Sequence, residues 1–317
     1  MNKQRIAVLG ATSHIAKGLI YNFLQEGNFE LHLYARSVDK AREFIKLIGQ
    51  DGNDKCIVHE QRDDLLTASY DTVINCVGVG TATKLQGDYS KYFTVTEEYD
   101  NLVLDYLRNG HPDTLYVSFS SGAVYGGEFS SPAQEDTTNC VQVNHIEPKD
   151  YYGIVRLNAE AKHRSLKDLN IVDLRLFAYF SRFIDLSDGY FITDIVNSIL
   201  HNTPLATNDS DFMRDFVHSA DLFALVLKCI AIKKLNMAVD VLSAAPIKKS
   251  EILAYFSQAY GLQYAMEPQV GVVSATGSKY AYYSAYANAE RVGFVPQFTS
   301  MDAIREEAAR LLPKAKI

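Results

Sequence analysis

The turn at residues 10–16 has residue types that could bind the phosphates of a dinucleotide. It has the sequence GATSHIA, after an apolar run at 6–9 and at the start of an amphipathic segment. A turn placed there lets a pyrophosphate meet the free N–H groups of a helix N-terminus. Of the three positions in a GxxGxxG spacing only the first is glycine, and a serine and an alanine occupy the others. The alternative is an ordinary strand-to-helix turn. We expect the cofactor-binding residues here to be Gly10, Thr12, Ser13, His14 and Ile15.

The end of the second apolar run, 31–34, has residues that suit a 2′-phosphate. Arg36 and Ser37 follow this run, and no acid stands where NAD-binding proteins hold the ribose hydroxyls. A guanidinium and a hydroxyl match phosphate oxygens, so we expect NADP(H), with NAD(H) as the alternative. Arg36 could instead be an ordinary solvated arginine. Asp64 is a further candidate, at the adenine pocket.

Alternating elements would position these residues. Short apolar runs alternate with segments of helical periodicity over the first 176 residues, which is typical of βαβ units and a parallel sheet. We expect an α/β fold, a Rossmann-type doubly wound parallel sheet over residues 1–176. Residues 177–317 should form mainly a smaller, mixed α/β substrate domain, with some elements returning to the first. The polar stretch 126–150 is long for an idle connection, so we interpret it as a functional loop. The expected strands are 6–9, 31–34, 71–75, 115–119 and 171–176, and the expected helices are 14–26, 38–48, 91–109, 151–168, 190–200, 219–232 and 249–260.

Composition excludes several classes of protein. The chain has 317 residues, 47% of them hydrophobic and 22% charged, as in ordinary globular proteins. Its net charge of −7 disfavours nucleic acid as a partner. No apolar run of membrane-spanning length is present, and we expect no membrane association. The cysteines Cys56, Cys76, Cys140 and Cys229 have no CxxC spacing, so we expect reduced thiols in a cytoplasmic protein and no metal site.

Seven segments in the same order resemble the extended short-chain dehydrogenases/reductases, the group of NAD(P)-dependent epimerases, dehydratases and ketoreductases of sugar nucleotides. GATSHIA is similar to the family's GATGFIG, and Val77-Gly78 stands where the family has its second cofactor loop. The other segments are SSGAVYG at 120–126, YGIVR at 152–156, LRLF at 174–177, RDFVHSAD at 214–221 and NAERVGFVP at 288–296.

The resemblance implies the catalytic residues. Tyr152 would move a proton on or off the sugar oxygen during hydride transfer. Arg156, four residues on along a helix, would supply the cation that favours the phenolate, where the family has lysine. Ser121 would hydrogen-bond the substrate oxygen. Tyr152 could instead be a structural tyrosine, and Ser121 an ordinary turn serine. Further residues expected at the cofactor are Cys76, Val77, Gly78 and Phe177 along with Tyr152 and Arg156, and those expected at the substrate are Lys84 and Arg214 along with Ser121.

The two residues that follow Ser121 bear on the type of reaction. Dehydratases of the family have an Asp-Glu pair where this chain has Gly122 and Ala123, so dehydration is disfavoured. A 4-ketoreductase with exchangeable NADPH remains the first expectation, and an epimerase with retained cofactor is the alternative. Further departures at Ala178 and Thr96, where the family has asparagine, keep open a non-catalytic nucleotide-binding protein. The resemblance also implies a homodimer formed through the helices near 91–109 and 151–168.

Overall fold

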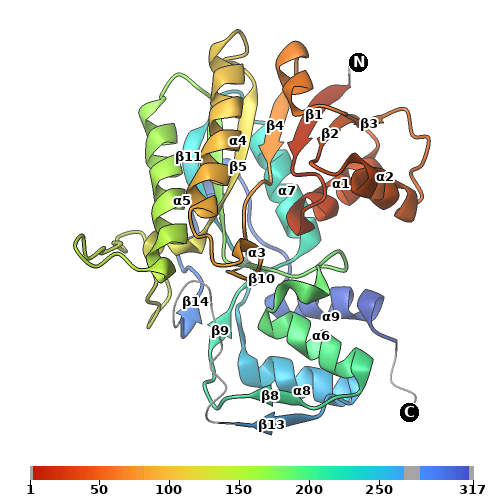
Figure 1. Cartoon of the computed structure of the whole chain (residues 1–317), viewed down its shortest axis with the longest axis vertical. Helices are drawn as coiled ribbons and strands as arrows, with labels where there is room; N and C mark the ends of the chain where they lie inside the picture. Colours follow the sequence, from red (N-terminus) through yellow and green to blue (C-terminus); the bar gives the residue numbers. More distant parts are fainter. Residues whose placement is uncertain (1–2, 81, 268–278, 314–317) are drawn as a thin grey trace.

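Seven parallel strands form the central sheet of the protein (Figure 1). The computed structural model describes residues 3–80, 82–267 and 279–313. The strand order is β11-β6-β5-β4-β1-β2-β3, as expected for a Rossmann-type sheet. The strands are β1 (Gln4–Leu9), β2 (Phe29–Tyr34), β3 (Cys56–Val58), β4 (Thr72–Asn75), β5 (Leu115–Ser121), β6 (Ile171–Leu176) and β11 (Asn236–Val241).

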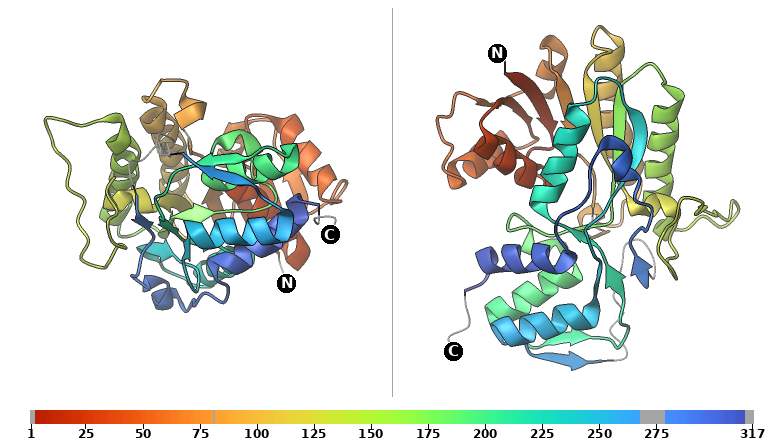
Figure 2. Two further views of the ribbon diagram at one scale, coloured as in Figure 1. Left: turned by 90° about the horizontal axis from the view of Figure 1, so that it is seen from below. Right: turned by 180° about the vertical axis from the view of Figure 1, so that it is seen from behind.

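Helices cover both faces of this sheet (Figures 1 and 2). On β1, Ile6 and Val8 pack in the core shared with α1 (His14–Glu26), α2 (Val38–Leu47) and α7 (Ser219–Ile230). Ala7 and Leu9 pack in the opposite core, under α4 (Lys91–Arg108). Adjacent to α4 lies α5 (Pro148–Ser165). Apolar side chains on both faces are the reason that the strands appear in the sequence as continuous apolar runs.

The register brings the loops after several strands to one edge. Leu9 pairs with both Tyr34 and Asn75, so β1, β2 and β4 end together. Asn75 pairs with Ser118, and β5 continues three residues further to Ser121. Ligands of open α/β sheets bind outside this carboxyl edge. The expected cofactor residues that follow these strands therefore share one side of the sheet.

A second core lies below that edge in Figure 1. It contains Phe180, Phe216 and Ile247 together with apolar residues of three helices. The elements here are α6 (Phe191–His201), α8 (Lys249–Tyr260) and α9 (Ser300–Leu311), with the short strands β7 (Ala178–Tyr179), β8 (Leu205–Thr207), β9 (Met213–Arg214), β10 (Phe216–Val217), β12 (Ile247–Lys248), β13 (Tyr264–Met266) and β14 (Ala281–Tyr282). Between β10 and β12 the chain returns to the central sheet and forms α7 and β11. We retain as a proposal the division into a dinucleotide domain, 1–176, and a mainly substrate-binding domain, 177–317.

The structure differs from the expected elements in a few places. Two strands of the central sheet were not predicted: β3, because its three residues are too short to show a period, and β11, because it lies in the part after residue 177 where the alternation becomes irregular. Helix α5 starts at Pro148 rather than 151, since the side chains of Glu147 and Asp150 form a capping box at its first turn. Short 3₁₀ helices complete the chain: η1 (Arg62–Thr67), η2 (Gly122–Tyr125), η3 (Leu186–Asp188) and η4 (Asn288–Val292), besides a one-turn helix, α3 (Ala82–Leu85).

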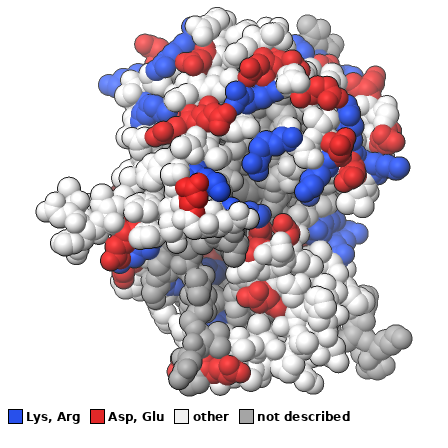
Figure 3. All heavy atoms as spheres, in the orientation of Figure 1, with Lys and Arg blue, Asp and Glu red and all other residues white. Residues whose placement is uncertain are grey.

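Two further properties concern the described residues. Their helices include none with the length and apolar content to cross a bilayer. Within the same residues no group of three or more His, Cys, Asp or Glu side chains is arranged to hold a metal ion. Figure 3 shows Lys and Arg side chains interspersed with Asp and Glu over the sheet-containing part of the face displayed.

Candidate active site

The turn between β1 and α1 touches the loop after β4. Gly10 has a φ of +71°, and a Cβ there would lie 3.0 Å from Val77 Cγ2 and 3.1 Å from the Cys76 carbonyl oxygen. Both the positive φ and this contact require glycine. Ser13 caps α1 by accepting from the Ala16 N–H at 3.4 Å. The first N–H groups of a helix have no intrahelical partner, so those of His14 and Ile15 are available to an anion.

The His14 side chain is occupied within the protein. Its Nε2 accepts the Ser181 backbone N–H at 3.1 Å and lies 2.8 Å from Ser181 Oγ. Burial, together with the charges of Lys17 and Lys84, lowers the pKa of His14 to about 3. The imidazole is therefore neutral. The residue can meet a phosphate through its backbone, while its side chain joins the turn to the segment after β7.

The residues expected at the adenosine end lie beside the ends of β2 and β3. Arg36 is exposed, and the described residues offer it no hydrogen bond or ion pair. Ser37 caps α2 by accepting from the Lys40 N–H at 3.4 Å. Asp64 Oδ2 lies 3.5 Å from Nδ1 of His59, a residue whose ring stacks on Tyr34 with centroids 4.4 Å apart. An unpaired arginine at this position fits a 2′-phosphate.

Close packing of α5 on η2 brings the expected catalytic residues to one place. A Cβ on Gly153 would lie 2.5 Å from the Ala123 carbonyl oxygen, so only glycine allows this approach. Gly153 follows Tyr152 in α5, and Ala123 is two residues beyond Ser121. The Tyr152 ring packs on Tyr92 of α4, with centroids 5.2 Å apart.

Arg156 is buried beside Tyr152, with 7% of its surface exposed. Its Cζ lies 5.3 Å from the Tyr152 ring centroid, and its Nη1 donates to the Phe119 carbonyl at 3.1 Å. Its Nη2 occupies the space that a Cβ on Gly78 would need. The guanidinium thus spans from the phenol to the second cofactor loop. Its buried Nε has no partner among the described residues, which leaves a donor for a bound group.

Ser121 lies beside the phenol of Tyr282. Its Oγ accepts the Ala123 N–H at 3.2 Å and lies 3.0 Å from the hydroxyl of Tyr282. Phe177 lies over Gly122 and packs against Tyr282, with ring centroids 5.3 Å apart. Tyr282 was not predicted from the sequence, because it belongs to none of the motifs.

Arg214 and Lys279 are neighbouring basic side chains without acidic partners in the part of the chain that the structure describes. Arg214 Nη1 donates to the carbonyls of Met213 and Lys279, at 2.7 and 2.8 Å. Its neighbours Asp211 and Asp215 instead bind Ser250 and the Ser243–Ser300 pair. Lys279 is 5% exposed, and its buried Nζ has no hydrogen-bond partner there. Burial lowers the pKa of Arg214 to about 10, and burial with the Arg214 charge lowers that of Lys279 to about 7. Such a pair fits an anionic ligand.

Lys84 has acidic partners. Its ammonium lies 2.5 Å from Asp188 and 3.9 Å from Asp185. These ion pairs join α3 to the η3 segment. These two carboxylates neutralise the charge of Lys84, whereas Arg214 has no acidic partner among the described residues.

A buried network of ion pairs and hydrogen bonds connects the elements that carry the candidate site. Arg175 on β6 binds Glu160 of α5 at 2.7 Å and Asp240 of β11 at 3.3 Å. Tyr125 of η2 donates to Asp240 at 2.9 Å, and Ser120 donates to Glu160 at 2.6 Å. Burial raises the pKa of Glu160, while Arg175 opposes this shift. The network fixes β5, η2 and α5 relative to one another.

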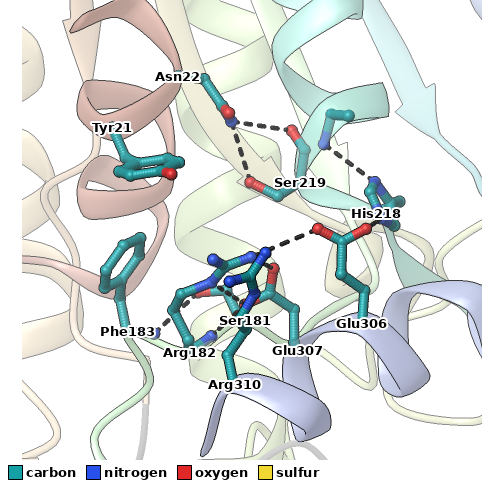
Figure 4. Close-up of a pocket in the computed structure, with 11 residues that line it drawn as sticks. Tyr21, Asn22, Ser181, Arg182, Phe183, His218, Ser219, Glu306, Glu307 and Arg310 are labelled. Atoms are coloured by element: carbon teal, nitrogen blue, oxygen red, sulfur yellow. Dashed lines mark hydrogen bonds and ion pairs between the residues drawn. The ribbon is translucent and has the colours of Figure 1, made fainter. Parts of the chain in front are cut away.

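The cavity in Figure 4 lies elsewhere, between α1, α7 and α9. Its volume is about 110 Å³, and none of the predicted site residues lines it. Arg182 and His218 are paired there with Glu307 and Glu306. We assign the candidate active site to the carboxyl edge of the sheet.

The chain thus combines a Rossmann-type sheet with a tyrosine–arginine pair beside the second loop at its carboxyl edge. A model described as "NAD dependent epimerase/dehydratase family" matches residues 6–239. The chain belongs to this family, which confirms the resemblance seen in the sequence. Among curated proteins, none matches the chain.

Solved structures confirm the fold. A UDP-glucuronic acid 4-epimerase mutant from Bacillus cereus, in complex with UDP-4-deoxy-4-fluoro-glucuronic acid and NAD, is similar with a TM-score of 0.80 and 16% identity, over 97% of this chain and 99% of that one. A UDP-N-acetylglucosamine 4-epimerase from Methanobrevibacter ruminantium has a TM-score of 0.78 and 14% identity, over 97% of each chain. A dTDP-glucose 4,6-dehydratase from Streptomyces venezuelae with bound NAD has a TM-score of 0.76 and 14% identity, over 97% and 96%.

Proposed function

We propose that this protein is an NADP(H)-dependent oxidoreductase of a nucleotide-activated sugar, acting as a 4-ketoreductase with Tyr152 as proton donor. The observation that carries the proposal is the buried Arg156 guanidinium, which touches both the Tyr152 ring and the Gly78 loop. A cation in that position lies beside the phenol and faces the place of the nicotinamide ribose. The lysine of the family is thus replaced by a group that retains the charge.

Each part of the site then has a task. When bound, the dinucleotide supplies a hydride to the sugar carbon. The α1 N-terminus holds the pyrophosphate, and the exposed Arg36 binds the 2′-phosphate. Ser121 donates to the ketone oxygen, and Tyr152 gives that oxygen its proton. Arg214 binds the substrate diphosphate, a role supported by its lack of an acidic partner among the described residues.

An epimerase with retained NAD is the second candidate. The similar structures that favour it are 4-epimerases with NAD bound, and NAD(H) is the alternative cofactor here. Dehydration is not proposed, because a side chain at Gly122 would clash with Phe177 and leaves no room for an acid. We also propose a homodimer formed through α4 and α5, as the family resemblance implies.

The test is NADPH oxidation with a pool of 4-keto sugar nucleotides, together with analysis of the cofactor that remains bound after purification. We expect turnover by the protein as purified and a loss of about 100-fold or more in Tyr152→Phe, with NADPH binding retained. Tyr151→Phe is the matched control, because Tyr151 packs instead on Phe93 and Tyr89. Interconversion of sugar nucleotides without added cofactor would favour the epimerase. Tight NADPH binding without turnover of any of these sugars would refute both enzymatic functions.

A further inference from the structure

Tyr282 reaches the catalytic serine from a distant part of the chain. It lies on β14, which pairs in parallel with β9, so that Tyr282 stands beside Arg214. Its hydroxyl is 3.0 Å from Ser121 Oγ, although 161 residues separate the two in sequence. The family motifs and the proposed function assign this side chain no role.

The hydrogen bonds of Ser121 limit where its own proton can point. A serine hydroxyl has one donor and two acceptor sites. The Ala123 N–H fills one acceptor site of Ser121. If Tyr282 donates into the other, the serine proton remains free for a third group. If Ser121 donates to Tyr282 instead, the serine has no proton left for a substrate.

Two features favour Tyr282 as the donor. Burial raises the pKa of Tyr282, so the phenol retains its proton. Ser121 Oγ lies within hydrogen-bond distance of that hydroxyl and can accept its proton, whereas the nearby Ala123 N–H can only donate to it. A largely buried O–H that turned away from Ser121 would lose this partner, which is costly. The arrangement that satisfies both groups has Tyr282 donating and Ser121 free to donate.

The surroundings hold the Tyr282 ring in place. It packs edge-on against Phe129 and Phe177, with centroids 4.9 and 5.3 Å away. The Ala281 N–H donates to the Phe129 carbonyl at 2.8 Å, which ties β14 to the loop after η2. Lys279 Nζ lies 3.8 Å from the centroid of the ring. When protonated, this ammonium is attracted to the face of the ring and helps to hold it.

We propose that Tyr282 is a positioning residue for Ser121: it donates to the serine oxygen and thereby directs the serine proton to the substrate oxygen. This inference rests on the proposed function. It adds to the site a second tyrosine that acts through the serine and transfers no proton to substrate.

Tyr282→Phe removes the hydroxyl and leaves the ring contacts. We expect kcat for NADPH-dependent reduction to fall about tenfold, the effect of one hydrogen bond, with KM changed less than about twofold. In Ser121→Ala, adding Tyr282→Phe should cause no further loss, because the two side chains act as one unit. Tyr283→Phe is the matched control, since its hydroxyl makes no hydrogen bond to the described residues, and it should leave kcat unchanged. If the double variant instead lost kcat by the product of the two single losses, the positioning role would be overturned.

A second measurement does not depend on turnover. In protein labelled with ¹³C at tyrosine Cζ, the resonance missing from Tyr282→Phe identifies Tyr282. We expect Ser121→Ala to shift that resonance and Tyr283→Phe to leave it in place. An unshifted resonance would overturn the hydrogen bond and with it the inference. A shifted resonance in a protein that turns over no sugar nucleotide would instead refute the proposed function, and with it the role of Tyr282 in positioning Ser121 for catalysis.

Discussion

Gly153→Ala tests whether close packing of α5 on η2 places Tyr152. A Cβ at this position would lie 2.5 Å from the Ala123 carbonyl oxygen and 3.4 Å from its carbonyl carbon. Ordinary contacts begin near 3.4 Å, so α5 or η2 must move by about 0.9 Å, the difference between 3.4 and 2.5. The atom in the way belongs to the backbone, which a rotamer change cannot relieve. The movement carries Tyr152 away from Ser121.

The expected effect is larger on catalysis than on stability. A misplacement of about 1 Å in a reacting group can reduce turnover by about 100-fold. Overpacking costs about 1–3 kcal/mol, whereas the better helix propensity of alanine returns about 1 kcal/mol. We therefore expect a stability loss of about 0–2 kcal/mol for Gly153→Ala, with kcat for NADPH oxidation down about 100-fold.

The control is Ala161→Gly, at an exposed position of the same helix. It should cost about 1 kcal/mol of stability without changing kcat. Urea denaturation measures the stability of both variants, and steady-state kinetics measures kcat. If Gly153→Ala kept the kcat of the unmodified protein, the packing of α5 on η2 would not be what places the phenol.

Three further predictions concern the anion sites and the buried charges. Arg214→Gln should weaken nucleoside diphosphate binding by about ten- to 100-fold in calorimetry, and Arg214→Lys less, because lysine retains the charge without the fork; equal affinities would remove this arginine from the site. Arg36→Ala should reduce affinity for NADPH about tenfold and that for NADH by less than twofold, and equal losses would refute 2′-phosphate recognition. Burial lowers the pKa of His163, but hydrogen bonds to Asp100 and Asp173 outweigh it and raise the value to about 9. This folded value exceeds the ordinary 6.5, so the stabilisation is complete below about pH 6.5 and is lost as the pH rises through 9. Thermal melting across that range should show the loss, and His163→Gln should abolish this dependence on pH.

Local sequence determined much of the fold. The apolar runs at 6–9 and 171–176 and the periodic segments between them predicted βαβ units, because fully buried parallel strands must be apolar on both faces. The glycine of the first turn was also predictable, since a positive φ at a strand-to-helix turn requires it. Strand β3 was missed, because three residues carry no measurable period, and β11 was missed, because it lies where strands and helices no longer alternate regularly.

The tertiary structure decided how the candidate site is completed. Motif spacing named Ser121, Tyr152 and Arg156, but no spacing relates Ser121 to Tyr282, whose hydroxyls meet only because β14 returns to the loop after η2. In the same way, the sequence could not tell whether Arg214 pairs with a neighbouring aspartate. The fold turned both aspartates toward serines and left the arginine without an acid in the described part of the chain. Local patterns encode the elements through backbone periodicity, whereas contacts between distant residues depend on how several elements pack at once.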